Sequence, residues 1–238
     1  MASNLTNRVF IGLILIIIVL TSFFFNLDIL LISVLVIFIT FDLIYINLIN
    51  KLILIFLAVI SVLSFFLISY EIFRNIYIFE IILILSTLFY KNFTRLFFTL
   101  SLYIFCIILF CIISEDRNLF YLIILISFFN DTIAYIFGRS LGGPLIVPYI
   151  SPKKTWSGTS ISFLATTFLL FFFNFNIFLS MCISIFLFLG DIFFSYIKRY
   201  LNLKDFSIIL KSHGGILDRL DSMFFVAIIF QFSLIYIL

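Results

Sequence analysis

The chain has 238 residues, of which 65% are hydrophobic and only 11% are charged. Soluble domains are about half apolar and about a quarter charged. This composition therefore excludes a soluble globular fold and leaves membrane lipids as the solvent for most of the surface. The net charge of +3 is too small to indicate binding to nucleic acid, and we expect no such partner.

A helix needs about 20 apolar residues to cross a membrane, and nine stretches approach or reach that length. We interpret the first as a retained helix and not as a cleaved signal peptide, because the next stretch follows within a few residues and no small-residue cleavage site separates them. The predicted fold is an all-α polytopic transmembrane helical bundle. The predicted spans are Val9–Phe25, Ile29–Ile49, Leu52–Tyr70, Asn75–Tyr90, Leu96–Ser114, Leu119–Phe137, Thr159–Asn174, Ile177–Ile197 and Leu220–Leu238.

Two connections are long and polar, 138–158 and 198–219, and both lie in the second half of the chain. We therefore predict N-terminal transmembrane spans over residues 1–118 and a transmembrane catalytic region over residues 119–238 that carries both loops. With nine spans and a cytoplasmic N-terminus, only Arg74 and Arg117 of the fourteen Lys and Arg residues lie outside. Because cytoplasmic segments are enriched in Lys and Arg, this bias supports the span number and places both loops in the cytoplasm.

Acidic residues inside or beside apolar stretches are the first candidates for chemistry. Asp131 and Asp191 lie in or at the end of predicted spans, where a carboxylate is costly and marks a functional site by default. The alternative is an ion pair that only fixes helix packing.

Asp218 and Asp221 are three residues apart at the start of the last span, so on a helix they share one face. Two such carboxylates repel each other unless a cation lies between them. Mg²⁺ prefers oxygen ligands and brings substrate phosphates with it, and Asp191 would complete the set from the preceding helix. Capping of the helix by Asp218 is the competing explanation.

Basic and glycine residues surround these acids in both loops. Gly214 and Gly215 follow the only histidine, His213, and two glycines permit a close approach of the backbone to phosphate. His213 would bind phosphate, orient a water molecule or cap a helix, and the sequence does not choose among these roles. The basic residues of the loops are Arg139, Lys153, Lys154, Lys198, Arg199, Lys204, Lys211 and Arg219.

These residues closely resemble the signature of the phosphatidate cytidylyltransferases, the CDP-diacylglycerol synthases. Its first part, Ser-x-x-Lys-Arg, Lys-Asp and His-Gly-Gly-x-x-Asp-Arg-x-Asp, is matched by Ser195, Lys198, Arg199, Lys204, Asp205, His213, Gly214, Gly215, Asp218, Arg219 and Asp221. An upstream part is similar at Asn130, Asp131, Thr132, Ala134, Tyr135, Gly138, Arg139, Ser151, Pro152, Lys154, Thr155 and Gly158, and Gly190-Asp191 is similar to a third part. The resemblance covers roughly residues 130 to 222.

The resemblance implies transfer of the cytidylyl group of CTP to phosphatidate, with release of pyrophosphate and a requirement for Mg²⁺, with a second cation left open. It implies Asp191, Asp218 and Asp221 as metal ligands. Together with these three, the implied catalytic residues are Lys198, Arg199, Lys204, His213 and Arg219. The implied substrate-binding residues are Asp131, Arg139, Ser151, Lys154, Thr155, Ser195, Asp205, Gly214 and Gly215.

Three positions depart from the family pattern, since Ser157 and Phe194 replace glutamates and Lys211 replaces a proline. A divergent or inactive member is therefore an alternative to an active enzyme. A membrane transporter is a second alternative, but transporters are typically built from repeat-related halves, whereas the polar features here crowd into one end of the chain. A kinase or synthase acting on another isoprenoid phosphate is disfavoured by the His-Gly-Gly and Asp-Arg-x-Asp spacing. A homodimer is left open.

The predicted orientation can be tested by cysteine labelling. After replacement of Cys106, Cys111 and Cys182, a single cysteine at Ser151 should react with a membrane-impermeant reagent only in permeabilised cells. A single cysteine at Asn118, which lies in a predicted external connection, is the control that should react in intact cells. Labelling at Ser151 from outside intact cells would contradict the orientation.

Overall fold

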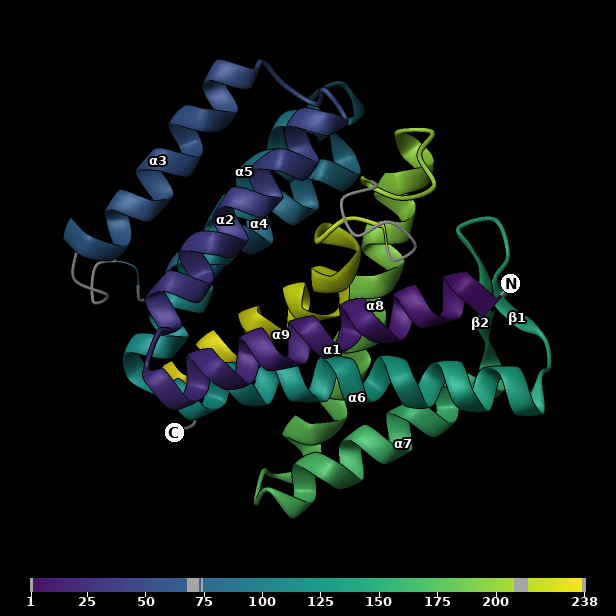
Figure 1. Ribbon diagram of the computed structural model, residues 1–238. Helices are drawn as coiled ribbons and strands as arrows, with labels where there is room; N and C mark the ends of the chain where they lie inside the picture. Colours follow the sequence, from purple (N-terminus) through teal and green to yellow (C-terminus); the bar gives the residue numbers. More distant parts are fainter. Residues whose placement is uncertain (1, 68–72, 74, 208–213, 237–238) are drawn as a thin grey trace. The chain divides into compact units, whose positions relative to one another are not determined.

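The computed structural model describes residues 2–67, 73, 75–207 and 214–236, and most of them are helical (Figure 1). Every apolar stretch predicted from the sequence contains one α-helix, so the prediction of an all-α membrane protein is confirmed. The α-helices of the described part are α1 (Ala2–Phe25), α2 (Asp28–Tyr45), α3 (Lys51–Leu67), α4 (Ile76–Phe89), α5 (Thr94–Glu115), α6 (Arg117–Leu141), α7 (Trp156–Phe172), α8 (Ile177–Tyr200) and α9 (Leu217–Tyr236), with a short 3₁₀ helix, η2 (Lys91–Phe93), before α5.

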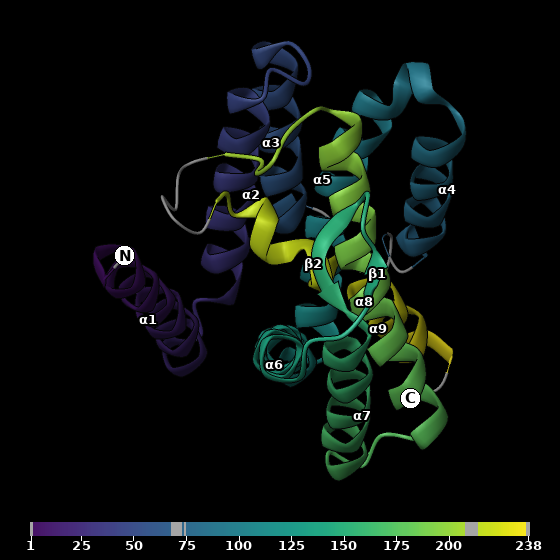
Figure 2. The same cartoon turned by 90° about the vertical axis from the view of Figure 1, so that its right-hand side faces the viewer.

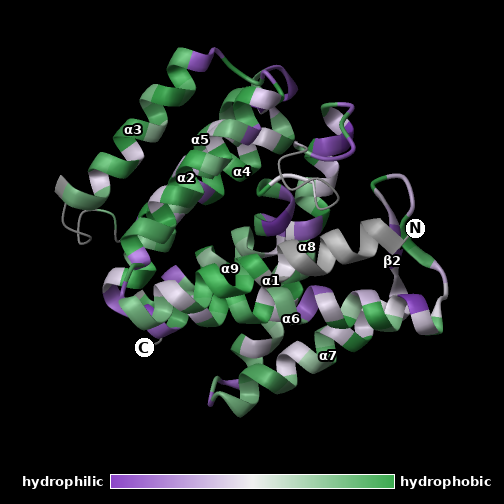
Figure 3. Ribbon diagram, in the orientation of Figure 1, coloured by the Kyte–Doolittle hydropathy of each residue, from purple (hydrophilic) through white to green (hydrophobic). Residues whose placement is uncertain are grey.

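The helices are apolar along most of their length, and hydrophilic residues gather mainly at the connections (Figure 3). Four helical segments of the described part are long and apolar enough to cross a membrane: α2, the segment Lys91–Glu115, α6 and α8. Other apolar helices, including α3, α4 and α7, are shorter. The protein is thus an integral membrane protein by composition and helix length, and the number of nine spans stays a prediction.

The first long connection contains a small β-hairpin that the sequence analysis did not predict. Strand β1 (Leu145–Val147) pairs with β2 (Ser151–Thr155) in antiparallel orientation, with a bulge between Leu145 and Val147. Strands of three and five residues are too short to show a period of two in the sequence. Helices α6 and α8 also continue beyond the predicted ends of their spans, to Leu141 and Tyr200, because polar residues can extend a helix past the apolar stretch.

The chain forms two compact units, one of Met1–Arg117, Asp205–Arg219 and Phe230–Leu238, and one of Asn118–Lys204 and Leu220–Ile229. In the first unit, α2, α3 and α5 pack against one another and α4 packs against α5. Its core follows a helical period. The fully buried apolar residues of α2 are Ile32, Val36, Ile39 and Leu43, and those of α5 include Phe98, Leu102, Ile108, Leu109 and Ile112.

In the second unit, α7 and α8 pack along each other, and the hairpin follows α6 and leads into α7 (Figure 2). Hydrogen bonds between side chains join the helices inside this apolar unit. Thr167 of α7 and Ser184 of α8 are 3.0 Å apart at their hydroxyl oxygens, and the Thr166 hydroxyl donates to Oδ1 of Asn130 on α6 at 3.4 Å. These contacts determine how α6, α7 and α8 lie around the hairpin.

Gly158 allows the start of α7 to approach α6 closely. A Cβ atom at Gly158 would lie 2.5 Å from the carbonyl oxygen of Ala134 and 2.9 Å from Cα of Gly138. Since both of these are backbone atoms, neither can move aside as a flexible side chain could. The absence of a side chain at Gly158 therefore determines where α7, and the strand β2 before it, can lie.

Replacement of Gly158 by alanine should destabilise the protein, because it forces α6 and α7 apart at a cost of about 1–3 kcal/mol. The measurement is the thermal unfolding midpoint of purified protein in detergent. Gly12→Ala is the matched control, because a Cβ at Gly12 meets no described atom within 4 Å and alanine favours a helix interior by up to about 1 kcal/mol. Equal midpoints for the two variants would contradict the packing argument.

Candidate functional site

Three carboxylates from three helices of the second unit meet at one place. Asp131 lies on α6, Asp191 on α8 and Asp221 near the start of α9, and one carboxylate oxygen of each lies within 4.8 Å of the others. All three side chains are partly exposed. The group, called the carboxylate cluster below, unites acids that are up to 90 residues apart in the sequence (221 minus 131).

Gly190 brings two of these carboxylates together. A Cβ atom at Gly190 would overlap the carbonyl oxygen of Asp221 and lie 3.3 Å from Cα of Ser222. The backbones of α8 and α9 are therefore in contact at this position, as small residues permit in membrane helices. Asp191 is the next residue on α8, so this close contact places it near Asp221.

Lys154 supplies positive charge to the carboxylate cluster. It lies on strand β2, and its Nζ forms an ion pair with Oδ2 of Asp191. The same Nζ lies 5.4 Å from the ring centroid of Phe188, which also lies on α8. Lys154 and Lys198 both attract the carboxylate of Asp221 electrostatically, whereas Asp191 repels it. The hairpin thus places the ammonium group of Lys154 beside the acids of the carboxylate cluster.

A cluster of phenylalanine rings lies one helical turn beyond Asp191 and Asp221. Phe194 and Phe224 are fully buried, and each follows a cluster acid by three residues. Their ring centroids are 5.2 Å apart in an edge-to-face arrangement, and the ring of Phe193 stacks on Phe224 at 6.0 Å. This apolar layer excludes water on one side of the acids, which strengthens every electrostatic interaction there.

Several other predicted site residues hold the hairpin in place. The Thr155 hydroxyl caps α7 by accepting a hydrogen bond from the Gly158 N–H at 3.3 Å. Arg199, at the end of α8, donates from Nε to the carbonyl oxygen of Ile150 in the hairpin turn at 3.2 Å. Ser151 begins strand β2 opposite Val147. These contacts connect α8, the hairpin and α7, and they fix the strand that carries Lys154.

The remaining predicted residues of the second unit lie nearer its surface. Arg139 is exposed at the end of α6, where it donates to the hydroxyl of Tyr135 at 3.1 Å. Ser195 is partly buried on α8, and Lys204 is exposed after the end of that helix.

Asp218 has a different environment from Asp221. Its Oδ2 accepts hydrogen bonds from the backbone N–H groups of Phe206 at 3.1 Å and Gly215 at 2.8 Å. Two of the three predicted metal ligands, Asp191 and Asp221, are thus grouped with Asp131, to which the resemblance assigned substrate binding. Asp218 instead binds the backbone of Phe206 and Gly215, both of which precede α9, so neither its role as a metal ligand nor its role as a helix cap is established by these contacts.

The other predicted residues of the first unit lie around the same turn. Gly214 is buried next to Gly215, whose N–H is directed to Asp218. Asp205 is exposed, and Arg219 is partly buried in the first turn of α9. His213 and Lys211 lie outside the described residues.

Asp42 is a residue that the sequence analysis missed. It lies on α2, is fully buried, and binds the segment around α9 through both carboxylate oxygens. The signal was present in the sequence, since Asp42 is an acid inside the predicted span Ile29–Ile49, and such acids deserve a functional hypothesis.

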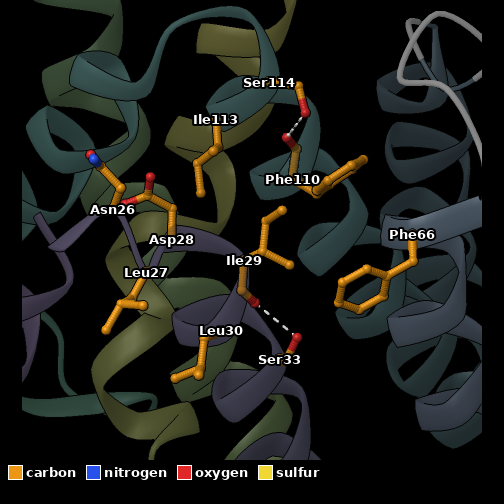
Figure 4. Close-up of a pocket in the computed structure, with 10 residues that line it drawn as sticks. All are labelled: Asn26, Leu27, Asp28, Ile29, Leu30, Ser33, Phe66, Phe110, Ile113 and Ser114. Carbon is orange, nitrogen blue, oxygen red and sulfur yellow. Dashed lines mark hydrogen bonds between the residues drawn. The ribbon is translucent and has the colours of Figure 1, made fainter.

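A cavity of about 620 Å³ lies in the first unit, and none of the predicted site residues lines it (Figure 4). Asp28, at its wall, forms an ion pair with Arg117 at 2.6 Å. The lining residues are Asn26, Leu27, Asp28, Ile29, Leu30, Ser33, Phe66, Phe110, Ile113 and Ser114. Most are apolar, and the only charge among them is already paired, so the carboxylate cluster is the better candidate for chemistry.

Comparison with known proteins gives a consistent result. The profile described as "Cytidylyltransferase family" matches residues 3–237. The chain is 40% identical over 118 residues to a phosphatidate cytidylyltransferase of Rickettsia bellii, covering 43% of this chain and 51% of the relative. It is 45% identical over 112 residues to one of Staphylococcus haemolyticus (43% of each chain) and 36% identical over 141 residues to one of Rickettsia conorii (52% and 61%). The matches thus span about half the length of these curated relatives.

The phenylalanine cluster predicts the effect of restoring the family's glutamate at position 194. Phe194→Glu would place a carboxylate among buried rings, one helical turn from Asp191, at a cost of several kcal/mol. Phe194→Leu is the control, because it keeps the position apolar and costs about 1.5 kcal/mol or less. We expect the thermal unfolding midpoint in detergent to fall much further for the glutamate variant than for the leucine variant. A glutamate variant as stable as the leucine variant would show that the position is more polar than the ring contacts indicate.

Proposed function

This chain belongs to the cytidylyltransferase family, and from that premise we propose that it transfers the cytidylyl group of CTP to phosphatidate, giving CDP-diacylglycerol and pyrophosphate. The observation that carries the proposal is the carboxylate cluster with Lys154 beside it, in an integral membrane protein. A phosphoryl-transfer site needs concentrated negative ligands for a metal ion and positive groups for phosphate. The cluster combines both within one unit.

The cluster fits a Mg²⁺ ion, which we propose as the cofactor. Three carboxylate oxygens within 4.8 Å of one another repel unless positive charge lies among them, and oxygen ligands are the ones that Mg²⁺ prefers. Asp131, Asp191 and Asp221 would hold the ion, with Asp131 in the place that the sequence analysis gave to Asp218. When bound, Mg²⁺ would neutralise charge on the phosphates of CTP, and a second cation would act in the same way.

The residues of the chain would position the two substrates. A phosphate oxygen of phosphatidate attacks the α-phosphorus of CTP, the bond to the β-phosphate breaks, and pyrophosphate leaves with the electron pair. Such a reaction needs positioning and charge stabilisation more than covalent help from the protein. Lys154 and Lys198, which both attract the Asp221 carboxylate, would neutralise the phosphates. Arg199 would hold the hairpin that carries Lys154.

We propose that the site faces the cytoplasm from a bacterial inner membrane. CTP is a water-soluble substrate and phosphatidate is a lipid, so the site must lie where the membrane meets the compartment that contains the nucleotide. The bias of Lys and Arg towards the predicted cytoplasmic segments supports this orientation. The homodimer stays a prediction.

The proposed function can be tested with purified protein, radiolabelled CTP, phosphatidate and Mg²⁺. We expect label to enter the lipid extract as CDP-diacylglycerol, and to stay out when phosphatidate is replaced by diacylglycerol, which lacks the attacking phosphate. Asp221→Asn should lower the rate by at least about 10²-fold, since an uncharged amide is a poorer ligand for Mg²⁺ and the cluster acts as a unit.

The matched control is Asp116→Asn, because Asp116 lies in the short connection between α5 and α6, outside the cluster. It should keep the wild-type rate. Labelled lipid with diacylglycerol as acceptor, or no labelled lipid from the wild-type protein, would contradict the proposed reaction. A wild-type rate for Asp221→Asn would instead remove the carboxylate cluster from the catalytic site.

A further inference from the structure

Asp42 is a fully buried acid near the end of α2, and it uses both carboxylate oxygens. Oδ1 accepts a hydrogen bond from the Ser207 hydroxyl at 2.6 Å, and Oδ2 accepts one from the backbone N–H of Leu217 at 2.9 Å. Leu217 is the first residue of α9. The first N–H groups of a helix have no hydrogen-bond acceptor inside the helix. Asp42, which is 175 positions from Leu217 in the sequence, supplies the acceptor for the N–H of Leu217.

Asp42 and Asp218 together link residues 206–207, which follow α8, to residues 215–217 at the start of α9. Asp218 joins the N–H groups of Phe206 and Gly215, and Asp42 joins Ser207 to Leu217. A Cβ atom at Gly215 would lie 2.5 Å from Oδ2 of Asp42 and 2.9 Å from Oγ of Ser207. A side chain at position 215 would therefore displace the Asp42 carboxylate or the Ser207 hydroxyl from their present places.

The start of α9 determines where Asp221 points. Asp221 follows Leu217 by four residues, so it lies about one turn further along the same face of the helix. An α-helix is rigid over one turn, and a shift or fraying of its first residues changes the direction of the side chains in the next turn. The negative charge of Asp42 at the N-terminus of α9 also favours the helix through its dipole.

We propose that Asp42 is a positioning residue for the cytidylyl transfer, which fixes the start of α9 by hydrogen bonds and thereby sets the direction of the Asp221 side chain one turn further along the same helix. This inference rests on the proposed function. Asp42 is not one of the three acids of the carboxylate cluster. Its effect should therefore appear in kcat, with the KM for CTP little changed, because binding of CTP does not depend on one misplaced carboxylate as strongly as the reaction does.

The test compares three variants in detergent. Asp42→Ala removes both hydrogen bonds, and a misplacement of about 1 Å at a reactive group costs about 10²-fold in rate, so we expect that loss in kcat. Asp42→Asn can keep both contacts, since its oxygen accepts from Leu217 and its NH₂ donates to the Ser207 hydroxyl, which is also an acceptor. We expect Asp42→Asn to recover most of the loss. Asp28→Ala, which removes a buried acid from the other end of α2, is the control for instability alone.

Hydrogen exchange at the Leu217 amide, followed by mass spectrometry, gives a second readout that does not depend on catalysis. Exchange should become faster in Asp42→Ala and stay as in wild type in Asp28→Ala. An unchanged kcat in Asp42→Ala, an equal fall in Asp28→Ala, or an asparagine variant as impaired as the alanine variant would overturn the proposal. If the wild-type protein made no CDP-diacylglycerol, the proposed function would fail, and the exchange result would decide by itself whether Asp42 holds α9.

Discussion

Repulsion among three carboxylates is the interaction on which the arrangement of the second unit depends. Asp131, Asp191 and Asp221 meet within 4.8 Å among helices that are otherwise mostly apolar. At low dielectric such like charges repel strongly, and positive charge close to the group reduces this repulsion. Lys154 and Lys198 provide positive charge from the chain. The proposed Mg²⁺ ion would add to it.

The backbone brings these charges together through close contacts and not through long side chains. Gly190 lets α8 touch α9, and Gly158 lets α7 touch α6. The hairpin between α6 and α7 is fixed at one end by the cap of Thr155 and at its turn by Arg199. As a result, Lys154 reaches Asp191 from a short strand. The phenylalanine cluster one turn away keeps water from that side.

Carboxylates serve two different purposes in this protein. Those of the cluster lie within 4.8 Å of one another. Asp42 and Asp218 accept four hydrogen bonds, three from the backbone N–H groups of Phe206, Gly215 and Leu217 and one from the hydroxyl of Ser207. A carboxylate that accepts backbone hydrogen bonds stabilises the local fold. Asp218 and Asp221, although three residues apart, therefore have different partners.

Hydropathy alone was enough to predict an all-α membrane protein, and the motifs pointed to the family and to most residues around the cluster. Hydropathy and motif spacing are local properties of the chain, so both can be read without knowledge of packing. The three-dimensional arrangement was needed to show that Asp131 joins Asp191 and Asp221, that Asp218 binds the backbone, and that Asp42 reaches the start of α9. Those facts depend on which faces of distant helices meet. That choice is made by glycine contacts and buried hydrogen bonds between segments far apart in the sequence, and no local pattern encodes it.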